Sequence, residues 1–170
     1  VEKGDRVAII LDNSVEWAAL SYGANALGAA YTAMYTHQHG KDWAFILEDA
    51  TPKVVAVQNT EVLDKLCDAL EDDAWPESGV ILLGEDPANQ LPPEGVTVRS
   101  WVELVQAGRA GDDLAEIADD PSALSTLIYT SGTTGNPKGV MPVSYTHLRA
   151  HETDSELVCR LLLEKIMSRN

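Results

Sequence analysis

The chain of 170 residues has little cysteine and no long apolar run. Its two cysteines, Cys67 and Cys159, are far apart and belong to no CxxC or Cys/His pattern, so we expect neither a disulfide framework nor a zinc site. No apolar run approaches 18 residues, and we therefore expect no transmembrane segment. Because disulfide-bonded proteins belong to oxidising compartments, a cytoplasmic location is the default expectation.

Basic residues are also scarce, with 12 Lys and Arg against 27 Asp and Glu and a net charge of −15. The imbalance is concentrated between Glu61 and Asp120, where 16 acidic residues face three basic ones. Recognition of a phosphate backbone requires a basic surface, so the sequence indicates no nucleic-acid partner. We interpret the acidic stretch as a solvated surface that favours solubility.

Short apolar segments alternate with helical patterns along the first half of the chain. Strands are predicted at 6–11, 29–34, 53–57 and 79–83, and helices at 14–27, 41–48 and 60–70. Strands that alternate with helices of this length predict an α/β fold, with an open, mainly parallel sheet and flanking helices.

The first predicted helix has recognisable ends. Asn13 and Glu16 have the spacing of a capping box, and Gly28 is a suitable stop. Apolar residues at steps of three and four predict its packed side, formed by Val15, Ala18, Ala19, Tyr22 and Ala26. Further along, a brief strand at 96–98 precedes a second capping box, Ser100 with Glu103, and a helix packed through Trp101, Leu104 and Val105.

The segment from Ala123 to Gly139 carries the clearest functional pattern. A predicted buried strand, 123–129, leads into a run of hydroxyls and glycines that ends in Pro-Lys-Gly, and 140–141 predicts a second strand. Glycines let the backbone approach a ligand, successive N–H groups can form an anion nest, and hydroxyls and a lysine add donors and charge. The pattern predicts a polyphosphate-binding loop made of Thr130, Ser131, Gly132, Thr133, Thr134, Gly135 and Lys138.

A Walker A loop does not fit, because Lys138 precedes a glycine and no Ser or Thr follows it directly. The stretch LIYTSGTTGNPK instead resembles the phosphate-loop signature of the adenylate-forming superfamily, which includes acyl-CoA synthetases and peptide-synthetase adenylation domains. GDRVAIILDNSVEW and FILEDATPKVVAV resemble the opening of an acyl-CoA synthetase N-terminal domain, and the likeness extends from about Lys3 to Met141. The segment YTHQH, 35–39, followed by KDW, is similar to the long- or medium-chain fatty-acyl branch of that family.

The resemblance implies a two-step reaction. A carboxylic acid, such as a fatty acid, would attack the α-phosphorus of ATP to give acyl-AMP and pyrophosphate, and coenzyme A would then take the acyl group. The loop would hold the β- and γ-phosphates, with Mg²⁺ held by a segment that this chain lacks. We expect no catalytic residue and no metal ligand in this sequence, which corresponds to about a third or less of such an enzyme. By itself the chain is expected to bind ATP weakly or not at all and to show no ligase turnover.

Other candidate sites are weaker. His37 and His39 have no third ligand at a recognisable spacing, so we interpret them as surface histidines. The pairs Asp112-Asp113 and Asp119-Asp120 are interpreted as solvated charge.

The likeness ends at Pro142, which suggests two parts, a partial AMP-binding domain at 1–141 and an atypical tail at 142–170. The tail contains SYTHLRAHETDSELVCRLLLEK, which resembles a read-through tail found on translated library sequences, and we expect it to be non-native. A genuine interaction helix is the alternative.

The start, Val1-Glu2-Lys3-Gly4, has no initiator Met or signal peptide and reads as an entry into a longer sequence. A truncated, non-catalytic anion-binding module and a degenerate P-loop NTPase also remain open.

Overall fold

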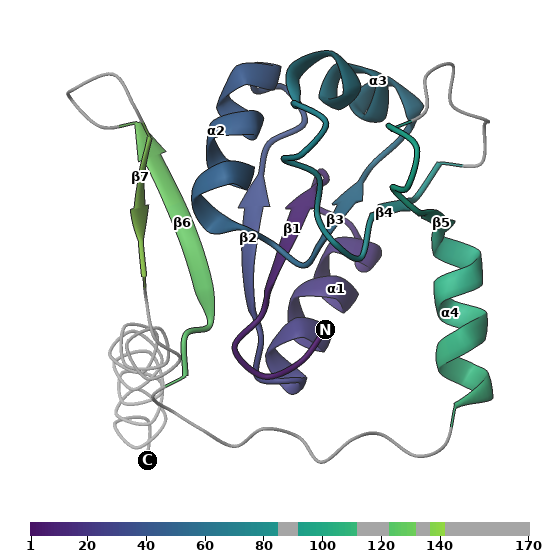
Figure 1. The fold of residues 1–170 in the computed structure, drawn as a ribbon. Coiled ribbons are helices and arrows are strands. Elements are labelled where there is room, and N and C mark those ends of the chain that lie inside the picture. Colours follow the sequence, from purple (N-terminus) through teal and green to yellow (C-terminus); the bar gives the residue numbers. More distant parts are fainter. Residues whose placement is uncertain (85–91, 112–122, 132–136, 142–170) are drawn as a thin grey trace, which may run out of the picture.

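The computed structural model describes residues 1–84, 92–111, 123–131 and 137–141 (Figure 1). Its elements in chain order are β1 (Arg6–Ile10), α1 (Val15–Ala26), β2 (Ala30–Met34), α2 (Gly40–Ala50), β3 (Val54–Val57), α3 (Thr60–Ala69), β4 (Val80–Leu82), β5 (Val98–Ser100), α4 (Trp101–Ala110), β6 (Thr126–Ser131) and β7 (Pro137–Val140). The predicted alternation of strands and helices is confirmed.

The strands form one seven-stranded sheet in the order β5-β4-β3-β1-β2-β6-β7. All neighbours are parallel except β6 and β7, which form an antiparallel pair at one edge. Figure 1 shows β6 pointing the same way as β1, β2 and β3, so that the end of β6 and the start of β7 lie at the carboxyl end of the parallel strands. This mainly parallel, open sheet confirms the predicted fold class.

Helices cover both faces of the sheet, because alternate residues of each buried strand point to opposite sides. On one side, Trp43 of α2 and Leu63 of α3 are fully buried against Ile10, Val55 and neighbouring strand residues. On the other side, α1 and α4 pack against Ile9 and Ala56 and their neighbours. The central strands β1, β3 and β4 are therefore buried on both faces, as is usual for parallel sheets.

The helix ends confirm some predictions and correct others. Ser14, not Asn13, is the N-cap of α1, and its Oγ accepts a hydrogen bond from the backbone N–H of Trp17 at 3.1 Å. The Asn13–Glu16 capping box was wrong because Ser14 offers the same cap chemistry one residue later. Gly28 has the positive φ, 71°, of a helix stop, and the Ser100–Glu103 capping box is present, both as predicted.

The predicted packed side of α1 was wrong. Val15 and Tyr22 are 81% and 75% exposed, whereas Ser21 and Ala24 are buried and Trp17 and Leu20 pack against the core. These four residues also recur at steps of three and four, so periodicity in a helix rich in apolar residues allowed two answers. Contact with the sheet decided which side is packed. It buries the side with Trp17, which forms an edge-to-face pair with Tyr31.

Two strand predictions needed smaller corrections. β5 begins at Val98, so the strand expected at 96–98 is shifted by two residues. The strand expected at 123–129 begins at Thr126 and continues to Ser131, and Ile128 within it is 47% exposed. The side chains on the predicted packed side of α4 are half-buried, and none is fully buried.

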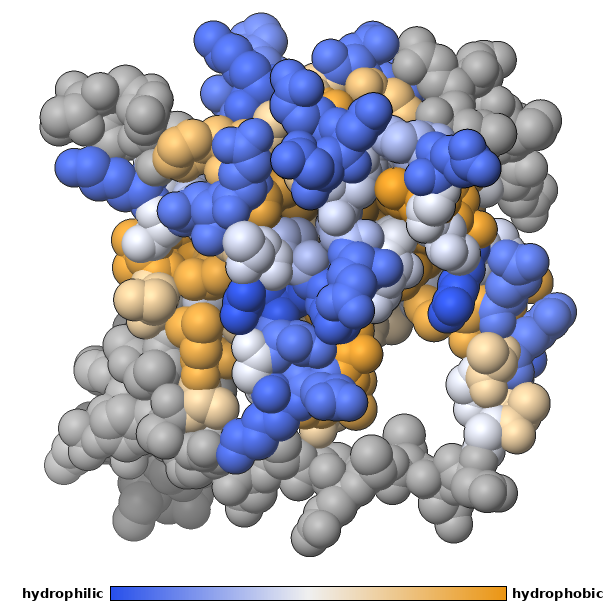
Figure 2. All heavy atoms as spheres, in the orientation of Figure 1, coloured by the Kyte–Doolittle hydropathy of each residue, from blue (hydrophilic) through white to orange (hydrophobic). Residues whose placement is uncertain are grey.

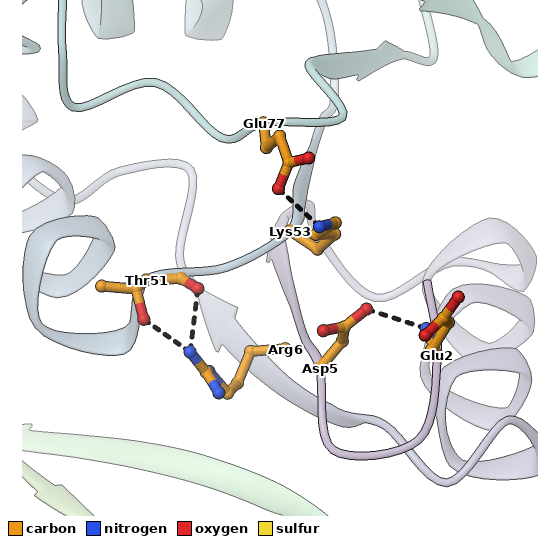
Figure 3. Close-up of polar contacts among 6 residues, drawn as sticks. All are labelled: Glu2, Asp5, Arg6, Thr51, Lys53 and Glu77. Carbon is orange, nitrogen blue, oxygen red and sulfur yellow. Dashed lines mark hydrogen bonds and ion pairs between the residues drawn. The ribbon is translucent and has the colours of Figure 1, made fainter.

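Polar contacts secure the amino-terminal edge of the sheet (Figure 3). Arg6, at the start of β1, donates from Nε to the Ala50 carbonyl at 2.8 Å and from Nη2 to the carbonyl and hydroxyl of Thr51. These bonds satisfy carbonyl groups at the C-terminus of α2, where a cation also complements the helix dipole. Lys53 and Glu77 form an ion pair nearby. Figure 2 shows hydrophilic side chains over the middle of this face and apolar ones toward its sides.

Candidate functional site

The two strands of the β6–β7 hairpin bring Thr130 and Lys138 opposite each other. The antiparallel register pairs Thr130 with Lys138 and Ser131 with Pro137, on either side of residues 132–136. Directly opposed residues in such a pair share a face, with Cβ atoms about 4.5–5.5 Å apart. A hydroxyl and an ammonium group therefore flank the base of the predicted loop, and both residues are exposed.

The predicted loop residues divide into two groups. The structure places Thr130, Ser131 and Lys138 on the two strands, and it brings Thr130 and Lys138 together. Gly132, Thr133, Thr134 and Gly135 lie outside the described residues, and the binding role of all seven residues stays a prediction. The described donors fit an anion, because a hydroxyl can donate and an ammonium supplies charge.

The opposite face of the hairpin carries Tyr129 and Gly139, which also pair across the strands. A Cβ added to Gly139 would lie 3.2 Å from Cζ of the Tyr129 ring, so the glycine leaves room for the ring. The Tyr129 hydroxyl donates to Oδ2 of Asp49 on α2 at 2.6 Å. Partial burial and the Asp49 carboxylate raise the pKa of the Tyr129 phenol, because both disfavour the phenolate.

A cavity of about 600 Å³ lies beside this hairpin. It is bordered by the carboxyl ends of β1 and β2 and by β6, and its lining residues include Trp17, Tyr31, Leu127 and Thr130. Ligands of open α/β sheets bind outside the carboxyl ends of the strands. The cavity thus offers apolar and aromatic walls directly next to one of the predicted loop residues.

Three residues that follow β1, β2 and β3 form a polar cluster at the same edge. Thr36 Oγ1 donates to Oδ1 of Asp12 at 2.7 Å, and Gln58 Nε2 donates to Oδ2 at 3.2 Å. The backbone N–H of Asp12 returns a hydrogen bond to Gln58 Oε1 at 2.7 Å. The bond from Thr36, followed by that from Gln58, lowers the pKa of Asp12, because both stabilise the carboxylate.

The described ranges contain neither a metal-binding cluster nor a membrane-spanning helix. No group of three or more His, Cys, Asp or Glu side chains there could hold a metal ion. No helix among these residues is long and apolar enough to cross a membrane. Asp112-Asp113 and Asp119-Asp120 fall outside the described residues.

Sequence reasoning missed Asp49, Gly139 and the Asp12 cluster. Tyr129 immediately precedes the hydroxyl run, and its phenol at the end of an apolar strand could have signalled a need for a polar partner. Nothing in the sequence pointed to Asp49, which is 80 residues away. Asp12, Thr36 and Gln58 each follow a predicted strand, and that shared position could have grouped them.

Fold and hairpin together define an α/β protein with a phosphate-loop pattern at the carboxyl edge of a parallel sheet. A family model described as AMP-binding enzyme matches residues 1–153. The chain therefore belongs to the AMP-binding enzyme family, which confirms the resemblance to adenylate-forming enzymes. The predicted boundary at 141–142 is not decided by this match, and residues 142–170 lie outside the described ranges.

Individual relatives agree with this assignment. The long-chain-fatty-acid–CoA ligase FadD13 of Mycobacterium tuberculosis is 32% identical over 163 residues, which cover 91% of this chain and 27% of that protein. A solved fatty acyl CoA synthetase of Mycobacterium tuberculosis is 30% identical with a TM-score of 0.60, over 85% of this chain and 25% of that one. The adenylation domain of a carboxylate reductase from Mycobacterium chelonae is 25% identical with a TM-score of 0.70, over 85% and 24%. The chain thus spans about a quarter of the length of these relatives.

Proposed function

We propose that this chain carries the polyphosphate-binding loop of an AMP-forming acid–thiol ligase. The ligase activates a carboxylic acid with ATP as acyl-AMP, releases pyrophosphate, and transfers the acyl group to coenzyme A. The observation that carries the proposal is the pairing of Thr130 with Lys138 on one face of the hairpin, within a chain of the AMP-binding family. Thr133, Thr134 and the glycines at 132 and 135 complete the proposed binding loop.

The proposed role of these residues is to bind and orient the leaving group. When a carboxylate oxygen attacks the α-phosphorus, negative charge gathers on the departing pyrophosphate. The Lys138 ammonium and the Thr130 hydroxyl offset that charge, and such preorganised donors lower the barrier where charge develops. Phosphoryl chemistry of this kind depends on positioning and charge neutralisation more than on covalent help. We propose no Mg²⁺ ligand among the described residues.

The proposed substrate class is a fatty acid. Two supports are the sequence of residues 35–39 and the names of the relatives, a long-chain-fatty-acid–CoA ligase and a fatty acyl CoA synthetase. The cavity beside Thr130 has apolar and aromatic walls that suit an acyl group. A carboxylate reductase adenylation domain has a similar fold. Acyl-AMP formation is therefore the broader part of the proposal, and transfer of the acyl group to coenzyme A is its narrower part.

Binding of pyrophosphate and ATP to the 170-residue chain, measured by titration calorimetry, tests the proposed site. Lys138→Ala removes the charge next to the loop, and Lys65→Ala removes an equal charge on α3, where Lys65 pairs with Glu61 on the surface. A hydrogen bond to a charged group contributes about 1.5–3 kcal/mol. We therefore expect Lys138→Ala to weaken pyrophosphate binding about tenfold or more and Lys65→Ala to leave it unchanged. Equal affinities in the two variants would refute the site.

ATP–pyrophosphate exchange separates the ligase from the non-catalytic anion-binding module. Because the chain spans about a quarter of its relatives, we expect it to bind ATP weakly at most and to form no acyl-AMP. Acyl-AMP formation by the chain alone would contradict that expectation and would directly support the ligase chemistry. Magnesium-dependent release of inorganic phosphate would instead support a P-loop-type NTPase.

A further inference from the structure

We propose that Asp49 is a positioning residue: through the Tyr129 hydroxyl it sets the orientation of the β6–β7 hairpin, and thereby of Thr130 and Lys138. The inference rests on the proposed function, because it assigns a role in presenting the proposed anion site. Asp49 lies on α2 and acts through Tyr129, not by contact with the ligand itself.

The hairpin needs such an anchor because its connection to the sheet is short. β6 pairs with β2 only through Tyr31 with Thr126 and Thr32 with Leu127. Residues 128–131 continue beyond that ladder and pair with β7 alone. Figure 1 shows the hairpin standing at the side of the sheet, with α2 as the neighbouring helix. Beyond Leu127, the Tyr129–Asp49 hydrogen bond ties β6 to the body of the domain.

Strand alternation links this bond to the site. Tyr129 and Gly139 occupy one face of the hairpin, and Thr130 and Lys138 occupy the other, because successive side chains point to opposite sides. Holding the Tyr129 ring against α2 therefore directs Thr130 and Lys138 away from α2. Gly139 contributes because its missing side chain leaves space for the ring.

Asp49 is a firm point of attachment. The next residue, Ala50, is buried, and its carbonyl accepts the Arg6 Nε hydrogen bond. Arg6 also holds Thr51, so β1 secures the end of α2 on which Asp49 lies (Figure 3). A phenol that donates to a carboxylate at 2.6 Å makes a charge-assisted bond, which is stronger than a neutral one.

The test uses the 170-residue chain with three variants and one control. Asp49→Ala removes the acceptor, Tyr129→Phe removes the donor, and Asp49→Asn keeps an acceptor oxygen without the charge. Glu48→Gln is the matched control, because Glu48 is exposed on the same helix and the substitution removes the same charge one residue away. Two readouts are measured, amide hydrogen exchange of 126–131 and 137–140, and pyrophosphate affinity.

Removal of either partner should speed hairpin exchange about tenfold and weaken pyrophosphate binding about fivefold or more, as expected for loss of a charge-assisted hydrogen bond. Asp49→Asn should recover much of both effects, and Glu48→Gln should resemble the unmodified chain. If Asp49→Ala acted only by disturbing α2, an acceptor oxygen in Asp49→Asn would not restore the hairpin exchange and the pyrophosphate affinity. If Asp49→Ala does not fold, Tyr129→Phe gives the same comparison without changing the helix.

Unchanged hairpin exchange in Tyr129→Phe and Asp49→Ala, relative to Glu48→Gln, would overturn the proposal. Faster exchange with unchanged pyrophosphate affinity would overturn it too, because the bond would then hold the hairpin without positioning the site. If the unmodified chain shows no pyrophosphate affinity, the proposed function of this chain fails, and exchange still decides whether Asp49 holds the hairpin.

Discussion

The body of the domain, β1–β5 with its helices, and the β6–β7 hairpin are held together very differently. In the body, β1 pairs with β2 over five residues and with β3 over four, and helices bury both faces. The hairpin has a two-residue ladder to β2, one side-chain hydrogen bond to α2, and exposed apolar residues such as Ile128 and Val140.

The difference shows how stability and chemistry are divided in this chain. In the body, strand and helix side chains are buried against each other, and burial of apolar area stabilises by about 25 cal/mol per Å². The residues that could bind a polyphosphate lie on the weakly attached hairpin, as binding residues often lie on segments positioned by a rigid scaffold. Changes in the body should therefore alter the free energy of unfolding, whereas changes in the hairpin should alter ligand affinity.

The largest effect is expected from Gly79→Ala in the body. Gly79 has φ of 80°, and a Cβ there would lie 2.0 Å from the backbone carbonyl oxygen of Thr97. Gly79 and Thr97 directly precede the paired strands β4 and β5, which hold both backbones in place, so we expect a loss of about 3 kcal/mol or more in urea denaturation. Gly95→Ala is the matched control, since Gly95 has φ of 103° with nothing within 4 Å of the added atom. Similar losses in both variants would show that the contact with Thr97 is unimportant.

A smaller effect, of opposite sign, is expected at the seam between body and hairpin. Thr32 is fully buried beside Leu127, and its hydroxyl has no hydrogen-bond partner among the described residues. Thr32→Val removes that unpaired polar group at similar volume and should stabilise the fold by about 1 kcal/mol. Thr36→Val should instead destabilise it, because the Thr36 hydroxyl donates to Asp12. Thermal unfolding of the two variants checks this, and destabilisation by Thr32→Val would contradict it.

The smallest effect is expected at Asp12, where the three strand ends meet. Its pKa lies below the ordinary value of 3.8, so its carboxylate stabilises the fold at neutral pH and loses that effect as pH falls through the folded pKa. Asp12→Asn should be slightly less stable than the unmodified chain at pH 7, and the gap should shrink toward zero below about pH 4. Urea unfolding from pH 2 to 7 measures this, and a gap that widens on acidification would contradict it.

Local patterns predicted most of the body. Apolar runs located strands β1 to β4, Gly28 was correctly placed as a helix stop, and Ser100 with Glu103 correctly gave a capping box. Each of these depends on residues within a few positions of one another. The site prediction likewise came from one continuous stretch, and the structure describes three of its seven residues, pairing Thr130 with Lys138.

Predictions failed where the choice depended on distant residues. Two stripes of α1 had suitable spacing, and only packing of Trp17, Ser21 and Ala24 against the sheet decided between them. One error was local. The N-cap of α1 was predicted one residue too early, at Asn13 instead of Ser14, because the two side chains have equivalent capping chemistry.

The sequence by itself determined the α/β class, the family and the stretch that carries the phosphate-loop pattern, because those depend on local periodicity and on a contiguous motif. Tertiary structure decided which face of α1 is buried, how Asp12, Thr36 and Gln58 meet, and how Asp49 anchors Tyr129. The hydrogen bonds among these residues join positions 24 to 80 apart. Such long-range bonds form only when the sheet brings separate strands side by side. The position of Asp12, Thr36 and Gln58 after predicted strands could group them, but no local pattern specifies which side chains bond.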